Sequence, residues 1–155
     1  MGKMNWQRIT LGGLLAGVII NVIEWVTNGM IFASDWASVM ARLNSSANFS
    51  LKQILAMNAW GFLTGIAMVW LYAAIRPRFG VGPKTAVLAG AAMWFMNYGL
   101  GGSFPVVAHW VPLGLATVTT LIGLVEAVIA AVAGAWIYKE AGQPEAKHFS
   151  QAAGL

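Results

Sequence analysis

The sequence has no cysteine and very little charge. The absence of cysteine excludes disulfides, thiolate metal sites and cysteine nucleophiles. Charged residues make up 9% of the 155 residues, against about 25% in a typical soluble domain. Only 5 residues are acidic, whereas 59% are hydrophobic and the mean hydropathy is +0.70. Such a chain is typical of an integral membrane protein, and its length favours a single domain.

Histidine and basic residues are also few, and their positions exclude further classes. The two histidines, His109 and His148, lie outside the long apolar runs, which argues against a haem with two histidine ligands inside the membrane. The net charge of +4 comes from basic residues beside apolar runs, so it indicates membrane topology and not a nucleic-acid partner. We expect no cofactor and no metal site.

The chain does have four long apolar runs, at residues 9–32, 54–75, 85–104 and 113–138. Each is long enough to cross a hydrocarbon core of about 30 Å as a helix that rises about 1.5 Å per residue. None shows the alternating polarity of a membrane β-strand. The sequence predicts an all-α, integral membrane four-helix bundle over residues 1–139, followed by a flexible cytoplasmic tail at 140–155.

The links between the runs differ in length. The first, Ala33 to Gln53, is long and polar, with Trp36, Val39, Met40 and Leu43 at helical spacing. A short interfacial helix over Ser34–Leu43, capped at Ser34 or Asp35, is one interpretation, and an ordered loop is the other. The links Arg76–Lys84 and Pro105–Pro112 are short, with proline and glycine as helix stoppers. The sequence YGLGG at residues 98–102 is expected to end or kink the third helix.

Basic residues predict the orientation. If both termini and the second link share one side, that side holds seven basic residues: Lys3, Arg8, Arg76, Arg78, Lys84, Lys139 and Lys147. The other side holds only Arg42 and Lys52. We therefore expect both termini in the cytoplasm, in a bacterial-type inner (plasma) membrane. The first run lacks a convincing cleavage site, so we expect an uncleaved span and not a signal peptide.

Each run carries its small and polar residues on one helical face. Residues three or four apart share a face, and this spacing defines four stripes: Gly13, Gly17, Asn21, Glu24 and Asn28; Asn58, Gly61, Gly65, Met68 and Tyr72; Ala86, Gly90, Met93, Asn97 and Gly101; Thr119, Gly123, Glu126, Ala130 and Gly134. Because lipid penalises a polar side chain, these faces should point into the bundle or at another protomer. We assign helix packing to seven of these residues: Gly13, Gly17, Gly61, Gly65, Gly123, Ala130 and Gly134.

The polar residues on these faces predict a pocket in the outer half of the bundle. Its candidate ligand- or ion-binding residues are Glu24, Glu126, Asn21, Asn28, Asn97, Asn58 and Thr119. No lysine or arginine lies within the predicted spans to neutralise the two carboxylates. They must therefore be protonated, exposed to a water-filled cavity, or paired with a cation, which suits proton coupling or cation binding. The alternative is that the glutamates and asparagines only hold helices together.

Two segments carry a resemblance to known proteins. EWVTNGMIFASDW, at Glu24 to Trp36, and AGAWIY, at Ala133 to Tyr138, resemble small four-span bacterial membrane proteins of unknown function. The resemblance implies the four-span plan and no catalytic residues. Small four-span multidrug transporters also use a glutamate in the first helix, but their surrounding pattern is not matched here.

The sequence supports two functional hypotheses, and a third is less favoured. The first is a membrane protein that binds or moves a proton, a cation or a small cationic or amphipathic molecule through Glu24 and Glu126. The second is a structural or accessory subunit. In either case the expected partners are the lipid bilayer and other protomers, as a homo-oligomer or within a membrane complex. A membrane enzyme is the least favoured, because no nucleophile–base pair or metal-ligand set is found.

Overall fold

The computed structural model describes residues 4–139, and every regular element in that range is a helix. In chain order the elements are α1 (Trp6–Val26), η1 (Thr27–Ile31), α2 (Ala33–Arg42), α3 (Leu51–Phe79), α4 (Pro83–Trp94), η2 (Phe95–Gly101), α5 (Gly102–Val107) and α6 (Leu113–Ile137). The two segments named η are π-helices. The all-α prediction is confirmed for this range, and the predicted tail at 140–155 lies outside it.

Three helical segments are long and apolar enough to cross a membrane: Trp6–Ile31, Leu51–Phe79 and Leu113–Ile137. They correspond to three of the four predicted spans, with slightly different ends, and support membrane association. The remaining predicted span, 85–104, is divided among α4, η2 and α5. As α4 has 12 residues, it is about 18 Å long, which is too short to cross the hydrocarbon core by itself.

Several predicted boundaries differ from the observed ones. The helix expected after the first span is present as α2, but its N-cap is Phe32, without a side-chain hydrogen bond, and not Ser34 or Asp35. The predicted link at 76–84 is mostly helical, because α3 continues through Pro77 to Phe79. The true turn contains Gly80 and Gly82, both with positive φ angles, and Pro83 opens α4. Likewise, α5 carries the helix past Pro105 to Val107.

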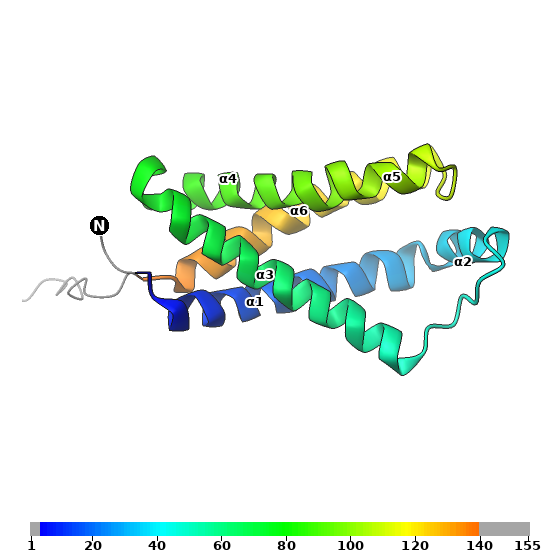
Figure 1. Cartoon of the computed structure of the whole chain (residues 1–155), viewed down its shortest axis with the longest axis horizontal. Helices are drawn as coiled ribbons and strands as arrows, with labels where there is room; N and C mark the ends of the chain where they lie inside the picture. The colour runs from blue at the N-terminus through cyan, green and yellow to red at the C-terminus, as the bar shows by residue number, and fades with distance from the viewer. Residues whose placement is uncertain (1–3, 140–155) are drawn as a thin grey trace, which may run out of the picture.

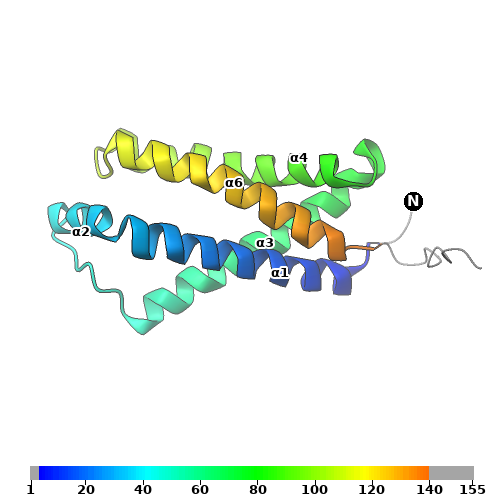
Figure 2. The same cartoon turned by 180° about the vertical axis from the view of Figure 1, so that it is seen from behind.

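The helices pack in a thin bundle in which α1 contacts α3 and α6, and α4 contacts α6 and α3. In Figure 1, α3 crosses obliquely in front, while Figure 2 shows α6 on the opposite side. The first ten residues of α3, 51–60, are all exposed and diverge from the other helices. Buried residues therefore concentrate in the second half of α3 and in the parts of α1, α4 and α6 that it contacts.

Glycines allow the helix backbones to approach closely. A Cβ atom added at Gly17 would lie 2.8 Å from Phe62 Cα, and one added at Gly65 would lie 2.9 Å from Gly17 Cα. Comparable overlaps exist between other helices, at Gly12 with Gly134 and at Gly90 with Ala127. Of the seven residues predicted to pack helices, all lie at close helix contacts or are fully buried: Gly13, Gly17, Gly61, Gly65, Gly123, Ala130 and Gly134.

A buried cation lies near the end of α3, where the sequence predicted only a link. The Arg76 side chain is 6% exposed, and its guanidinium carbon lies 5.4 Å from the centre of the Tyr138 ring. Tyr138 also makes an edge-to-face contact with Tyr72, with ring centres 6.0 Å apart. These aromatic and cation–π contacts attach the end of α6 to α3.

The element order repeats along the chain. In both halves a helix leads through a π-helical segment into a short helix, and a long helix comes next: α1, η1, α2 and α3, then α4, η2, α5 and α6. Each π-helical region also has the same local sequence, a tryptophan and, three residues later, an asparagine. These pairs are Trp25 with Asn28 and Trp94 with Asn97. The two irregular segments thus occupy equivalent places in the two halves.

Candidate functional site: a glutamate–tyrosine–glutamate cluster

Two carboxylates from different helices meet at one hydroxyl group. Glu24 lies in the last turn of α1, Tyr98 lies in η2, and Glu126 lies in the middle of α6. The Tyr98 hydroxyl donates to Glu24 Oε1 and lies 3.3 Å from Glu126 Oε1. Glu126 is 4% exposed, and the other two residues are partly buried. The structure therefore brings Glu24 and Glu126 together, through a residue that the sequence analysis did not select.

The second contact of the Tyr98 hydroxyl limits where the hydrogen atoms of the cluster can lie. A tyrosine hydroxyl carries a single hydrogen, whereas an ionised carboxylate can only accept. If the Tyr98 hydrogen points to Glu24, a hydrogen bond with Glu126 requires a proton on the Glu126 carboxyl, which then donates to Tyr98 Oη. Without that proton, two acceptor oxygens face each other in a mostly apolar surrounding, which is costly unless a cation or a water molecule lies between them.

Two further residues extend the cluster toward α2. Asn28 Nδ2 donates to Glu24 Oε2, and the indole of Trp36 donates to Asn28 Oδ1 over 2.9 Å. Both oxygens of Glu24 thus accept a hydrogen bond from a neutral group. Since an indole N–H only donates, this side of the cluster holds Glu24 in place but cannot pass a proton onward.

The π-helical segments determine which side chains reach the cluster. In η1, the Phe32 N–H donates to the Thr27 carbonyl over 2.9 Å, and in η2 the Gly102 N–H donates to the Asn97 carbonyl. Each bond joins residues five positions apart, so each turn holds one residue more than an α-helical turn. The extra residue rotates the later side chains about the helix axis. Tyr98 lies inside this widened turn of η2, next to Asn97, the residue that α-helical spacing selected, and it is Tyr98 that contacts both carboxylates.

Gly123 makes room for Tyr98 on α6. A Cβ atom at Gly123 would lie 2.6 Å from Cζ of the Tyr98 ring, which is closer than Cβ atoms come in real structures. The aromatic ring therefore lies directly against the α6 backbone, one helical turn before Glu126. The predicted packing role of Gly123 is in this way linked to the position of the hydroxyl.

In the described part of the chain, the side chains of the four other candidate residues donate hydrogen bonds to backbone carbonyls and not to the cluster. Asn21 Nδ2 donates to the carbonyls of Gly17 and Asn58, at 2.9 and 3.2 Å, and so joins α1 to α3. The side chains of Asn58, Asn97 and Thr119 each donate to carbonyls of their own helical segment. Asn58 is exposed, while Asn97 and Thr119 are partly buried. These three residues take no part in the cluster.

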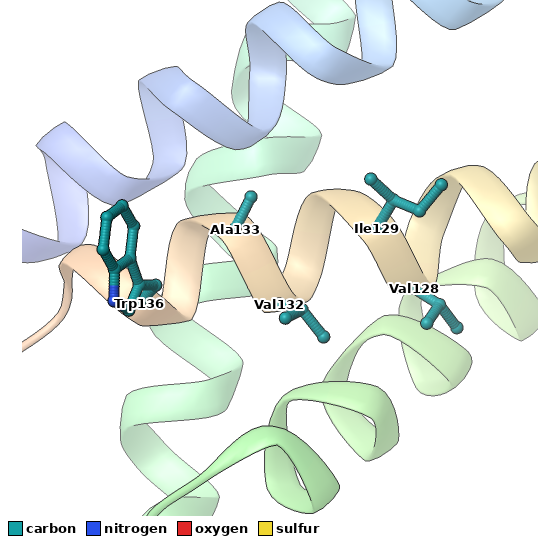
Figure 3. A pocket seen from close by; sticks show the side chains of 5 residues that line it. All are labelled: Val128, Ile129, Val132, Ala133 and Trp136. Atoms are coloured by element: carbon teal, nitrogen blue, oxygen red, sulfur yellow. The ribbon is translucent and has the colours of Figure 1, made fainter.

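A hollow of about 480 Å³ on the surface does not coincide with the cluster. It is lined by five residues of α6, namely Val128, Ile129, Val132, Ala133 and Trp136 (Figure 3). This lining has no carboxylate, amide or hydroxyl group. A hollow of this kind suits an acyl chain and cannot coordinate a cation.

This arrangement of side chains is poorly suited to binding a metal ion. Among residues 4–139, no group of three or more histidine, aspartate or glutamate side chains lies close enough to hold a metal ion. Two carboxylates and a phenol offer few hard oxygen ligands compared with the six to eight that Ca²⁺ takes. The cluster is better suited to a proton or a monovalent cation.

Replacing Trp36 by phenylalanine tests the outer end of the cluster. The change leaves an aromatic ring but removes the only hydrogen that Trp36 donates to Asn28. We expect the free energy of unfolding to fall by about 1 kcal/mol, which is typical for one lost hydrogen bond. Chemical unfolding in mixed micelles measures the change. Trp25→Phe is the control, because Trp25 is 64% exposed, and an equal loss in both variants would contradict the assigned role.

None of the protein families, curated proteins or solved structures compared with the chain matches it.

Proposed function

We propose that the chain is an integral membrane protein that binds a proton, or a small cation in its place, between Glu24 and Glu126. In this proposal α4, η2 and α5 together form a fourth crossing, since they continue one another from Pro83 to Val107. The excess of basic residues then favours both termini on the cytoplasmic side of a bacterial-type inner membrane. The cluster lies in the outer half of this bundle.

One observation carries the proposal, namely the contact of a single hydroxyl with two carboxylates. Glu24 and Glu126 lie 102 positions apart in sequence, in α1 and α6, and Tyr98 joins them within the bundle. Ionisable groups inside a membrane bundle are costly and are found where ions or protons bind. A site with two carboxylates and one shared hydrogen accommodates one further positive charge.

The hydroxyl also offers a route for a proton between the two carboxyl groups. A proton on Glu126 passes to Tyr98 Oη while the original hydroxyl hydrogen passes to Glu24. The O–H bond of the Glu126 carboxyl breaks, a new one forms at Glu24, and Tyr98 ends as it began. No further reactant is needed, because the hydroxyl both accepts and donates.

A structural role is the alternative, and the outer part of the cluster favours it. Asn28 and Trp36 satisfy Glu24 from a side that cannot relay protons, so they serve to hold α1, η1 and α2 together. In that case Glu126 retains a proton permanently and only joins α6 to η2. Oligomer formation, which both alternatives allow, stays a prediction for the single chain described.

Infrared spectroscopy of the full chain in liposomes tests the proposal. We expect the wild type at neutral pH to show one protonated carboxyl group, whose signal is lost in Glu126→Gln and altered in Glu24→Gln. Alkaline pH, or K⁺ and Na⁺ at neutral pH, should remove the signal in the wild type. The control is Asn58→Ala, because the Asn58 side chain is exposed and donates only to its own helix.

The same experiment separates the two alternatives. A protonated carboxyl that responds to neither pH nor cations, but disappears in Glu126→Gln, supports the structural role. A spectrum that Glu126→Gln leaves unchanged contradicts the protonation of Glu126 on which both depend.

A further inference from the structure

A second polar feature lies between α2 and the start of α6, outside the glutamate–tyrosine cluster. This cleft has a volume of about 290 Å³. One wall comes from Phe32 and α2, and the other from Pro112 and the first residues of α6: Phe32, Asp35, Ser38 and Arg42, facing Pro112, Gly114, Leu115 and Val118. Figure 2 shows α2 and the start of α6 at the same end of the molecule. We refer to it as the α2–α6 cleft.

The polar wall of the α2–α6 cleft carries one charge of each sign. Asp35 lies in the first turn of α2 and Arg42 in the last, on a shared helical face with Ser38 between them. The two charged residues are seven positions apart, or about 10 Å along the helix axis. They are thus placed to bind the two ends of one ligand, a cationic group at Asp35 and an anionic group at Arg42.

The other wall is apolar and leads toward the lipid-exposed surface. Leu115 and Val118 belong to α6, whose sequence qualifies it to cross a membrane, and Val118 is exposed. The neighbouring residues before α2, Met30 and Ile31, are also exposed. The cleft therefore lies where a membrane-crossing segment ends, at the depth of the lipid headgroups and not in bulk water.

Two other residues of α2 anchor it to the protein. Val39 is 1% exposed, and Trp36 donates to Asn28, so α2 is attached to the end of α1 while Asp35 and Arg42 remain exposed. None of the residues that line the cleft belongs to the glutamate–tyrosine cluster. A ligand can occupy the cleft without displacing any residue of that cluster.

We propose that the α2–α6 cleft binds the zwitterionic headgroup of a phospholipid. Its primary ammonium group contacts Asp35, its phosphate contacts Arg42, and its acyl chains lie along the apolar surface of α6 at Leu115 and Val118. A headgroup with both charges explains why the cleft holds an acid as well as a base. An anionic lipid would need only the arginine.

Native mass spectrometry of the full chain in detergent tests this site with phosphatidylethanolamine and phosphatidylglycerol as probes. Asp35→Asn should weaken phosphatidylethanolamine binding about three- to tenfold and leave phosphatidylglycerol binding unchanged, whereas Arg42→Gln should weaken both by a similar factor. Equal binding of both lipids by the wild type, or no effect of either substitution, would overturn the proposal.

Gly114 allows a steric version of the same test. Gly114→Leu adds a bulky side chain to the lining of the cleft, and its Cβ atom has room because a Cβ built at Gly114 meets nothing within 4 Å. We expect it to reduce phosphatidylethanolamine binding at least threefold, on the order expected when a ligand loses part of its contact surface. The control is Gly102→Leu, because Gly102 is equally open but lies outside the cleft. Equal binding by the two leucine variants would place the lipid elsewhere and contradict the proposal.

Soluble phosphoethanolamine distinguishes a lipid from a free zwitterion. If the acyl chains contribute along α6, calorimetry with the soluble headgroup should show binding at least about tenfold weaker than that of the phospholipid. Binding of the soluble compound with undiminished affinity, sensitive to Asp35→Asn and Arg42→Gln, would overturn the assignment to a lipid.

Discussion

Tyr98→Phe is expected to lower the free energy of unfolding by about 2–4 kcal/mol, although it removes only one oxygen atom. The Glu24 carboxyl group loses the hydrogen bond that it accepts from the Tyr98 hydroxyl, and Glu126 loses its contact with the same hydroxyl. A buried group left without its partner costs about 1–3 kcal/mol, and more when it is charged. The phenylalanine ring still fits against Gly123, so packing is nearly unchanged.

Reversible unfolding in mixed micelles measures this loss. Thr119→Val is a matched control, because it also removes one hydroxyl, and that hydroxyl donates only to carbonyls of its own helix. The control should change the free energy of unfolding by less than about 1 kcal/mol. Equal effects in the two variants would contradict a central role for the Tyr98 hydroxyl.

A double-mutant cycle assigns the loss to the carboxyl groups. In a Glu126→Gln background the contact with Tyr98 is altered before the hydroxyl is removed, so Tyr98→Phe should cost less there than in the wild type. We expect a coupling free energy of about 1–2 kcal/mol, within the range for residues in one hydrogen-bond network. Additive effects would mean that Glu126 and Tyr98 act independently.

Gly65→Ala is expected to destabilise the protein by about 3 kcal/mol, although it adds a single methyl group. The new Cβ atom would overlap the backbone of α1 at Gly13 and Gly17, which cannot move aside as a flexible side chain can. Overpacking in a core costs about 1–3 kcal/mol, and the rigid neighbours place this variant at the upper end of that range. The helices α1 and α3 are forced apart at a close backbone contact.

The matched control is the same substitution at an open position. At Gly114 an added Cβ meets nothing within 4 Å, so Gly114→Ala should be neutral or stabilising by up to about 1 kcal/mol, as alanine favours helices over glycine. Thermal unfolding monitored by circular dichroism compares the two variants. A neutral Gly65→Ala would mean that α1 and α3 are not in backbone contact.

The regular parts of the site could be predicted because α-helical spacing holds there. Glu24 and Glu126 lie in α-helices, and the stripes that contain them do face the bundle interior. Tyr98 escaped prediction because the stripe drawn with α-helical spacing runs through its neighbour Asn97, and η2 departs from that spacing. A tyrosine within an apolar run, one residue from a polar stripe, was the available signal.

Two other features depend on tertiary contacts that a sequence does not display. From its position in the sequence, Trp36 is expected only as an aromatic residue at the membrane interface. Its hydrogen bond to Asn28 could not be predicted, because it requires α2 to fold back against the end of α1. Arg76 is expected in a turn because Pro77 should stop a helix. In the structure α3 continues past Pro77 to Phe79, and Arg76 is buried against Tyr138, a contact with the end of α6 that the sequence does not display.

The two π-helical turns also have a consequence for how such a site arises. Each is equivalent to the insertion of one residue into an ordinary α-helix. The cluster therefore depends on one extra residue in the helix near residue 98. Deleting one residue there would restore a regular helix and remove the site. In this stretch of the chain, the hydrogen bonds of a regular α-helix and those of the cluster therefore require different backbone geometries.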